Sequence, residues 1–268
     1  MSIFTNKIVV ITGGSEGIGK ALVDTFLQLG AKVATCGRNY DKLYLLQTTH
    51  PGLPLLIHTA DVSKEAECQK FINTTIEAFG TIDILINNAG ISMRALFADV
   101  ELDTIRKVMD INFWGTVNCT KFALPYITQN NGTVVGVSSI AGYRGLPGRS
   151  GYSASKYAVN GWLEALRTEL LDSGTNIMWV CPGFTSSNIR NVALDKNGMS
   201  QGESPMDEGA MMAAEECAGH IVKAIEKRKR TLVLTFTGKR AVFLNRFFPA
   251  LADKLVRKFF FKNGELVK

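Results

Sequence analysis

The sequence lacks the features of a membrane-spanning, secreted or metal-binding protein. No apolar stretch approaches the ~20 residues needed to cross a bilayer, and the polar start of the chain does not resemble a signal peptide. The five cysteines show no CxxC spacing, which favours reduced and buried thiols. The three histidines are too scattered to form a set of metal ligands. We therefore expect a cytoplasmic protein with no metal site.

Positive charge is also scarce in most of the chain. Residues 1–226 hold 18 Lys and Arg against 22 Asp and Glu, a net charge of −4. Residues 227–268 hold 12 against 2, a net charge of +10. The overall charge of +6 is therefore a property of the C-terminal segment, which needs an explanation of its own.

Short β-branched runs alternate with segments of helical periodicity over most of the chain. The first run, Ile8 to Ile11, is continuously apolar, as expected for a strand covered on both faces. Repeated β-α-β units require right-handed crossovers and a parallel sheet with helices on both faces. The pattern therefore predicts an α/β fold with a doubly wound parallel sheet. The expected strands are 8–11, 32–36, 54–58, 82–86, 133–137, 176–181 and 231–236, and the expected helices lie near 18–29, 40–48, 64–79, 101–127 and 153–172.

The segment between Pro182 and Pro205 shows no convincing period. A stretch of this length inside a compact domain is typical of a lid or binding loop. A serine cap, a proline in the first turn and an acid at the third position then predict a helix that starts at 204–207 and runs to about Glu226. No internal repeat or linker interrupts the chain.

The motif TGGSEGIG at residues 12–19 follows the first strand and opens the first helix. Glycine at these positions lets the backbone approach a pyrophosphate, whose charge then lies at the helix N-terminus. The spacing is Gly-x-x-x-Gly-x-Gly. A glycine-rich turn without a ligand is the alternative, and the strand–turn–helix context argues against it.

The end of the second strand predicts which dinucleotide is bound. An acidic residue there would bond the adenosine 2′-hydroxyl and repel a 2′-phosphate. Gly37 stands in its place, and Arg38 offers a planar fork suited to phosphate. Glu16 in the glycine loop argues the other way, since it would weaken phosphate binding. The pattern favours NADP(H) as cofactor, with a solvated loop arginine as the alternative role of Arg38.

Tyr152 and Lys156 lie four residues apart, on one face of a predicted helix. A lysine ammonium about 5 Å from the phenol would favour the phenolate by roughly 3 kcal/mol, which brings tyrosine toward the useful range for acid–base catalysis. Ser139 ends a strand 13 residues earlier, so both hydroxyls could hold one carbonyl oxygen. A serine-hydrolase interpretation is weak, because the second glycine of a nucleophile elbow and a triad histidine are lacking. Asn112 is an unusual polar residue in an otherwise amphipathic helix.

Together these motifs resemble the short-chain dehydrogenase/reductase family over residues 5 to about 236. TGGSEGIG matches the family's glycine loop, NNAG at 87–90 matches its structural motif, and YSASK at 152–156 matches its YxxxK. The resemblance implies a single-domain Rossmann-type fold and hydride transfer between nicotinamide and a carbonyl or secondary alcohol. It implies that Tyr152 is the acid/base, Ser139 orients the substrate oxygen, Lys156 binds ribose and lowers the Tyr152 pKa, and Asn112 holds a relay water.

The resemblance also implies the cofactor-binding residues. Asp61 and Val62 would contact adenine, Asn88 would line the cofactor cleft, and Ser187 would replace the family's carboxamide-binding threonine. The expected cofactor set is Gly13, Ser15, Gly17, Ile18, Gly19, Arg38, Asp61, Val62, Asn88, Tyr152, Lys156, Pro182, Gly183, Thr185 and Ser187.

Within the family the chain is similar to ketoreductases of lipid-like or steroid-like substrates. We expect a small-molecule carbonyl or alcohol substrate, no nucleic-acid partner, and a homodimer or homotetramer built on the helices near 101–127 and 153–172. The rival interpretation is a catalytically silent dinucleotide-binding sensor or scaffold. The substrate itself is not specified, because a fold does not determine substrate.

Residues 1–238 are expected to form the dinucleotide-binding and catalytic domain, and residues 239–268 a basic amphipathic extension. In that extension one helical stripe is apolar and the opposite face is mostly basic, which is typical of an interfacial membrane helix. The alternatives are that the stripe packs on the sheet, on a neighbouring subunit or over the substrate pocket. The stripe consists of Leu251, Ala252, Leu255, Val256, Phe259 and Phe260; the opposite face of Asp253, Lys254, Arg257 and Lys258.

Overall fold

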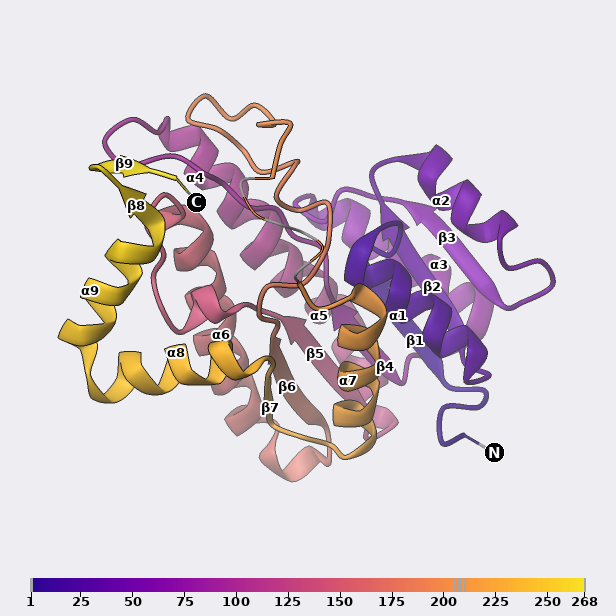
Figure 1. Ribbon diagram of the computed structural model, residues 1–268. Coiled ribbons are helices and arrows are strands. Elements are labelled where there is room, and N and C mark those ends of the chain that lie inside the picture. The colour runs from indigo at the N-terminus through magenta and orange to yellow at the C-terminus, as the bar shows by residue number, and fades with distance from the viewer. Residues whose placement is uncertain (1, 205, 207–208, 210, 268) are drawn as a thin grey trace.

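A computed structural model describes residues 2–204, 206, 209 and 211–267. Its main sheet has seven parallel strands in the order β3-β2-β1-β4-β5-β6-β7, with helices on both faces (Figure 1). The order reverses direction between β1 and β4, so the expected doubly wound fold is confirmed. The strands are β1 Ile8–Thr12, β2 Lys32–Gly37, β3 Leu55–Thr59, β4 Ile84–Asn87, β5 Thr133–Val137, β6 Asn176–Cys181 and β7 Thr231–Val233.

Two apolar cores sandwich the sheet, because the central strands are buried on both faces. One core lies beneath α1 and α7, to which α2 adds Leu46. The other lies beneath α3, α4, α5 and α6. The helix bounds are α1 Gly17–Gln28, α2 Tyr40–Thr48, α3 Glu65–Phe79, α4 Leu102–Met109, α5 Gly115–Gln129, α6 Ser150–Glu169 and α7 Ala214–Glu226.

Three expected elements need correction. The helix expected over 101–127 is divided into α4 and α5 by a π-helical turn at Asp110–Trp114. The last strand ends at Val233, because the following residues turn into a further helix whose first residue is Phe236. The helix expected to start at 204–207 starts at Ala214 instead, and residues 205 and 207 of its expected cap lie outside the described residues.

The C-terminal segment folds back onto the body as two helices and a small hairpin. Helix α8 spans Phe236–Phe247, α9 spans Pro249–Phe260, and β8 (Phe261–Lys262) pairs with β9 (Glu265–Leu266). Figure 1 places this yellow segment beside α6 and the start of α4. The boundary expected at residue 238 thus falls inside α8, and the division of the chain there stays a prediction.

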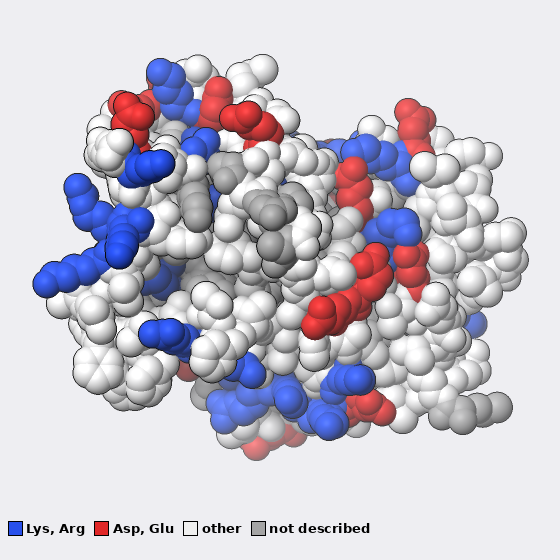
Figure 2. Space-filling model, viewed as in Figure 1, with Lys and Arg blue, Asp and Glu red and all other residues white. Residues whose placement is uncertain are grey.

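Basic side chains gather along this segment. Figure 2 shows Lys and Arg along the α9 edge and in a second group beneath the α7–β7 connection. That connection contains residues 227–230, four consecutive basic residues. Within the part of the chain that the structure describes, no helix has the length and apolar character needed to cross a membrane.

Candidate active site

A cavity of about 720 Å³ opens at the carboxyl ends of the parallel strands. Loops that follow β1 to β6 form most of its wall, and α6, α8 and α9 close the remaining side. Ligands bind at this edge in open α/β folds, because the loops converge there at the point where the strand order reverses. The cavity therefore lies where the expected site should be.

Every residue expected to bind the cofactor lines this cavity, and so does Ser139. Segments that are far apart in the sequence are thus brought together as predicted. The exception among the expected residues is Asn112, which does not reach the cavity wall.

The glycine loop is shaped for close approach by a ligand. Gly13 has a φ of +68°, and a Cβ there would lie 2.9 Å from Ala89 Cα. A Cβ on Gly19 would lie 2.1 Å from the Gly13 carbonyl oxygen, so only glycine permits this turn. The Asn88 amide donates to the Thr12 and Gly13 carbonyl oxygens at 3.0 Å each. Asn88 therefore holds the loop against the end of β4, and the loop fits a dinucleotide pyrophosphate at the start of α1.

At the adenosine end of the cavity the balance of charge favours an anion. Gly37 carries no acid, and a Cβ there would be in ordinary contact with Ser15 Oγ at 3.5 Å. Arg38 is exposed at the cavity rim. The Glu16 carboxylate is paired with Lys42 Nζ at 2.6 Å. The pair offsets the repulsion that Glu16 alone would exert on a phosphate, so the residues present fit a 2′-phosphate. Lys42 was not foreseen from the sequence.

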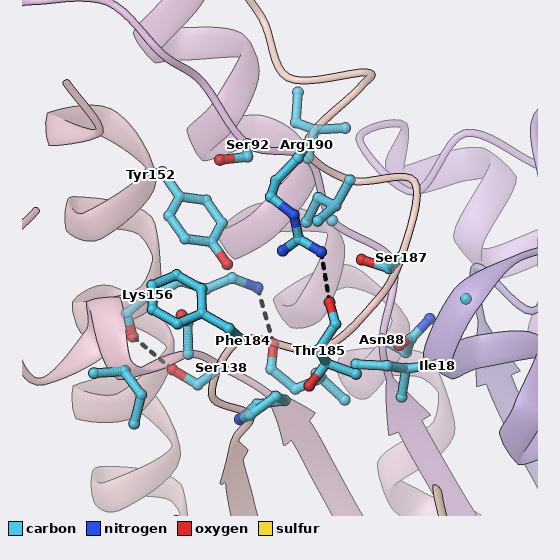
Figure 3. A pocket seen from close by; sticks show the side chains of 18 of the residues that line it. Ile18, Asn88, Ser92, Ser138, Tyr152, Lys156, Phe184, Thr185, Ser187 and Arg190 are labelled. Carbon is cyan, nitrogen blue, oxygen red and sulfur yellow. Dashed lines mark hydrogen bonds between the residues drawn. The ribbon is translucent and has the colours of Figure 1, made fainter. Parts of the chain in front are cut away.

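Tyr152 lies in the first turn of α6 and Lys156 one turn later, so the helix presents both to the cavity. Ser139, the second residue after β5, lies near enough to Tyr152 for its side chain to lower the pKa of the Tyr152 hydroxyl. The Lys156 ammonium lies 5.7 Å from the centre of the Tyr152 ring. Figure 3 shows Tyr152, Lys156 and Arg190 around one space. The expected serine, tyrosine and lysine therefore meet at a single point.

The pKa of Tyr152 differs from the expectation. Burial raises its pKa above the usual value, which opposes the predicted depression by Lys156. The side chain of Ser139 and the nearby charges of Arg149 and Arg190 lower the pKa, but their effects are smaller. In the ligand-free protein Tyr152 is therefore a protonated group at neutral pH, able to donate a proton.

Lys156 is itself perturbed by its surroundings. The residue is 4% exposed, and burial lowers its pKa from 10.5 to about 8. Its ammonium donates to the Val137 carbonyl oxygen at 2.9 Å, which directs the side chain toward the end of β5. A buried lysine near neutrality can change its protonation state readily, which suits a group next to a proton donor.

Asn112 braces the site from behind. Its amide nitrogen donates to the Ile91 carbonyl oxygen and to Ser155 Oγ, both at 2.9 Å, and its amide oxygen accepts from the Ile91 N–H at 2.8 Å. The side chain thereby connects the π-helical turn, the loop after β4 and α6. Both amide protons are engaged, so a relay water held by Asn112 stays a prediction.

Sequence reasoning did not single out the arginines of the cavity. Arg149 precedes α6, and Arg190 lies in the loop after β6, where it donates to the Thr185 carbonyl oxygen at 2.6 Å. Phe259 and Phe260 of α9 also line the cavity. The three-residue spacing between Arg149 and Tyr152 is the one local signal that could have indicated a shared position.

The apolar stripe of α9 faces this cavity, which agrees with one of its expected roles. Ala252 and Phe260 are buried, and Leu255, Val256 and Phe259 line the cavity. On the other face Asp253 pairs with Arg144 at 2.6 Å. The stripe therefore forms part of the site.

Comparison with known proteins decides the family. The model of the short chain dehydrogenase family matches residues 7–198. The chain belongs to the short-chain dehydrogenase family. It is 34% identical over 262 residues to dehydrogenase/reductase SDR family member 7B of Mus musculus, with 94% of this chain and 80% of that protein covered. It is 36% identical over 237 residues to 11-beta-hydroxysteroid dehydrogenase-like 6 of Arabidopsis thaliana, with 85% and 69% covered.

Solved structures of short-chain dehydrogenases support the fold. One from Burkholderia phymatum, in complex with NAD, superposes with a TM-score of 0.83 at 23% identity and covers 94% of this chain and 96% of that one. An alcohol dehydrogenase from Thermococcus sibiricus, complexed with 5-hydroxy-NADP, superposes with a TM-score of 0.74 at 22% identity, with 85% and 95% covered. Membership of the family, shown by its model and by the relatives above, assigns oxidoreductase activity to this chain at the level of the family.

Proposed function

We propose that this short-chain dehydrogenase is an NADP(H)-dependent ketoreductase for hydrophobic substrates. The observation that carries the proposal is the meeting of Ser139, Tyr152 and Lys156 in a cavity whose far wall is apolar. A carbonyl oxygen near Tyr152 would accept hydrogen bonds from both hydroxyls, which polarises the carbon for reduction. The nicotinamide, when bound, supplies the hydride to that carbon.

The residues present can supply the proton that the substrate oxygen gains. Tyr152 gives its hydroxyl proton to the substrate oxygen, and the alcohol is formed. The resulting phenolate lies near the charges of Lys156, Arg149 and Arg190 and is then reprotonated from solvent. Because burial raises the Tyr152 pKa, the protonated form prevails at neutral pH, which favours the reductive direction.

Three features support NADP(H) over NAD(H). Gly37 leaves no acid to repel a 2′-phosphate, Arg38 lies at the rim, and Lys42 neutralises Glu16. Of the two neighbours described above, one is a complex with NAD and the other with 5-hydroxy-NADP, so these neighbours do not favour either cofactor. The preference therefore rests on the residues of this chain.

A panel of ketones and alcohols with both cofactors tests the proposal. Reduced nicotinamide is followed by absorbance, and we expect NADPH-dependent reduction of ketones with extended apolar groups. NADPH binding without turnover on any member of the panel would instead support the rival hypothesis of a silent dinucleotide sensor. Faster turnover of small polar ketones would contradict the hydrophobic substrate.

We also propose a homo-oligomer built on α4–α6. Trp114 in the π-helical turn is 51% exposed and Tyr157 on α6 is 45% exposed, and apolar surface of this kind favours a subunit contact. Size-exclusion chromatography with light scattering tests the assembly. We expect a dimer or tetramer that Trp114→Ser weakens, and a monomeric wild-type protein would contradict it.

A further inference from the structure

Arg149 is a buried cation that the proposed reaction leaves without a fixed role. It is 7% exposed and immediately precedes α6, three residues before Tyr152. Its side chain lines the cavity, where the guanidinium carbon lies 5.5 Å from the centre of the Phe260 ring. In residues 2–204, 206, 209 and 211–267 its side chain takes part in no hydrogen bond or ion pair.

The surroundings of Arg149 are positively charged. Burial lowers its pKa most, Tyr152 acts in the opposite direction, and the charges of Arg94 and Arg190 lower it further. The start of α6 adds the positive end of a helix dipole. Burying a charge without a partner is unfavourable, and proteins compensate it with an opposite charge. Here the compensating group has room in the cavity itself.

The opposite side of the cavity is apolar. Phe259 stacks on Phe184 with the ring centres 6.1 Å apart, and Leu255 and Val256 extend this wall along α9. Arg149 lies where this wall meets α6, because Phe260 is the ring beneath its guanidinium. A molecule that reaches Tyr152 is therefore offered one cationic contact and one apolar surface.

We propose that Arg149 binds an oxyanion of the substrate, so that the substrate is a ketone or alcohol with a carboxylate or phosphate near the reacting carbon and an apolar chain against α9. The guanidinium matches such groups because its planar fork donates two parallel hydrogen bonds. The spacing of Arg149 and Tyr152 places the anion within a few bonds of the carbon that is reduced. This inference deepens the proposed function and rests on it for the identity of the reacting group.

The first test measures binding and requires no turnover. Protein saturated with NADP⁺ is titrated by calorimetry with decanoate, decyl phosphate and decan-1-ol, which share a chain and differ in the headgroup. We expect at least one anion to bind roughly tenfold or more tightly than the alcohol, and Arg149→Gln to remove the difference. Arg149→Lys retains the positive charge and should retain part of the difference in affinity between anion and alcohol. Arg106→Gln, at a 67% exposed side chain on α4, is the matched control and should change nothing.

The second test uses turnover. A 3-oxo acid and its methyl ester of the same chain length are compared with NADPH. Arg149→Gln should raise the KM for the acid about tenfold or more and leave the KM for the ester almost unchanged. Circular dichroism of each variant checks that the fold is retained.

Several results would overturn the inference. Equal binding of anions and alcohol by the wild-type protein would do so, as would displacement of NADP⁺ by the anions. An Arg149→Gln variant whose kcat pH profile shifts equally for acid and ester, without a split in KM, would mean that the arginine acts on Tyr152 instead. If anion selectivity is present and lost in Arg149→Gln while no ketone is reduced, this inference stands and the proposed reaction fails.

Discussion

The dinucleotide-binding body and the C-terminal helix pair place their apolar side chains differently. In the body every residue of the central strands β1, β4, β5 and β6 is buried beneath helices on both faces. In the pair, α8 buries only Gly238 and α9 only Ala252 and Phe260. Phe236, Phe243 and Phe247 of α8 are 81%, 54% and 58% exposed. Apolar side chains hold the body together, whereas those of the pair face the cavity or the outside.

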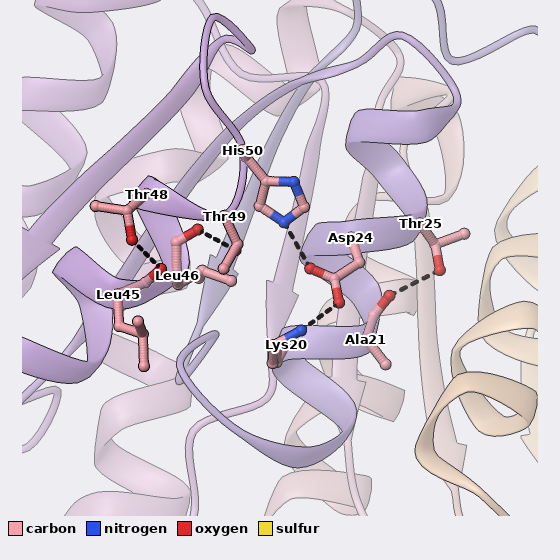
Figure 4. Close-up of polar contacts among 9 residues, drawn as sticks. All are labelled: Lys20, Ala21, Asp24, Thr25, Leu45, Leu46, Thr48, Thr49 and His50. Atoms are coloured by element: carbon pink, nitrogen blue, oxygen red, sulfur yellow. Dashed lines mark hydrogen bonds and ion pairs between the residues drawn. The ribbon is translucent and has the colours of Figure 1, made fainter.

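The polar contacts differ in the same way. In the body Asp24 pairs with Lys20 at 2.6 Å and with His50 at 2.8 Å, which ties the end of α2 to α1 (Figure 4). The polar contacts of the helix pair with the body include Arg144, which donates to Asn245 and Asp253, and Asn245, which donates to the Tyr143 carbonyl oxygen. Elements with few buried contacts open more easily than a core. The comparison indicates that the body carries the chemistry and that the pair decides what reaches it.

The largest expected effect is on the chemistry of the body. Tyr152→Phe removes the proton donor and should lower kcat by roughly 10²–10⁴-fold while NADPH still binds. Tyr44→Phe, at a 53% exposed position on α2, is the control and should leave kcat unchanged. Substantial residual turnover in Tyr152→Phe would mean that another group donates the proton.

Cofactor choice should depend on the body as well. Arg38→Ala should weaken NADPH binding about 10- to 100-fold, because a charged contact to the 2′-phosphate is lost. NADH lacks that phosphate, so its affinity should stay the same. Fluorescence titration of both cofactors measures the difference. A wild-type protein that binds NADH as tightly as NADPH would contradict the proposed cofactor.

The helix pair should set the preference for chain length. Each methylene buried against α9 contributes ~0.8 kcal/mol, so kcat/KM should rise about fourfold per added carbon until the wall is filled. Phe259→Ala should flatten this dependence and lower kcat/KM for the longest ketone by about tenfold. Phe243→Ala, which lies outside the main cavity, is the control. If kcat/KM depends equally on chain length in Phe259→Ala and Phe243→Ala, the apolar chain of the substrate lies elsewhere.

A smaller effect concerns Lys156 and pH. Its folded pKa of about 8 lies below the ordinary 10.5, so between these values the unfolded chain binds more protons and stability rises with pH. From pH 7 to 9 the free energy of unfolding of the cofactor-free wild type should increase by about 1 kcal/mol relative to Lys156→Met. Denaturant unfolding measures it, with exposed Lys70→Met as control. Parallel pH curves for wild type and Lys156→Met would contradict a buried, perturbed lysine.

The smallest expected effect is attachment of the helix pair to a membrane surface, which stays a proposal. Exposed Phe243, Phe247 and Phe248 lie near basic residues that contribute about 1 kcal/mol each at an anionic bilayer. The protein should cosediment with vesicles that contain phosphatidylserine at low salt and less so at high salt. Changing the three phenylalanines to serine should abolish this, whereas Leu45→Ser on α2 should not. Wild-type protein that remains in the supernatant would disprove the contact.

The sequence by itself determined the sheet, the glycine loop and the Ser139–Tyr152–Lys156 arrangement. These follow from local information: strand periodicity, a turn that only glycine permits, and a four-residue helical spacing. The break of the long helix at Asp110–Trp114 could not be read in the same way, because Asn112 is held there by partners distant in sequence. The start of α7 was misjudged because cap residues are common in loops as well.

Only the tertiary structure decided the electrostatics and the far wall of the cavity. The pKa values of Tyr152 and Lys156 depend on burial and on charges from other elements, neither of which a spacing reveals. Lys42 meets Glu16 across 26 residues, and Arg149 meets Phe260 across more than a hundred. The sequence predicted the apolar stripe of α9. What the stripe covers depends on where the chain folds back, which long-range packing decides.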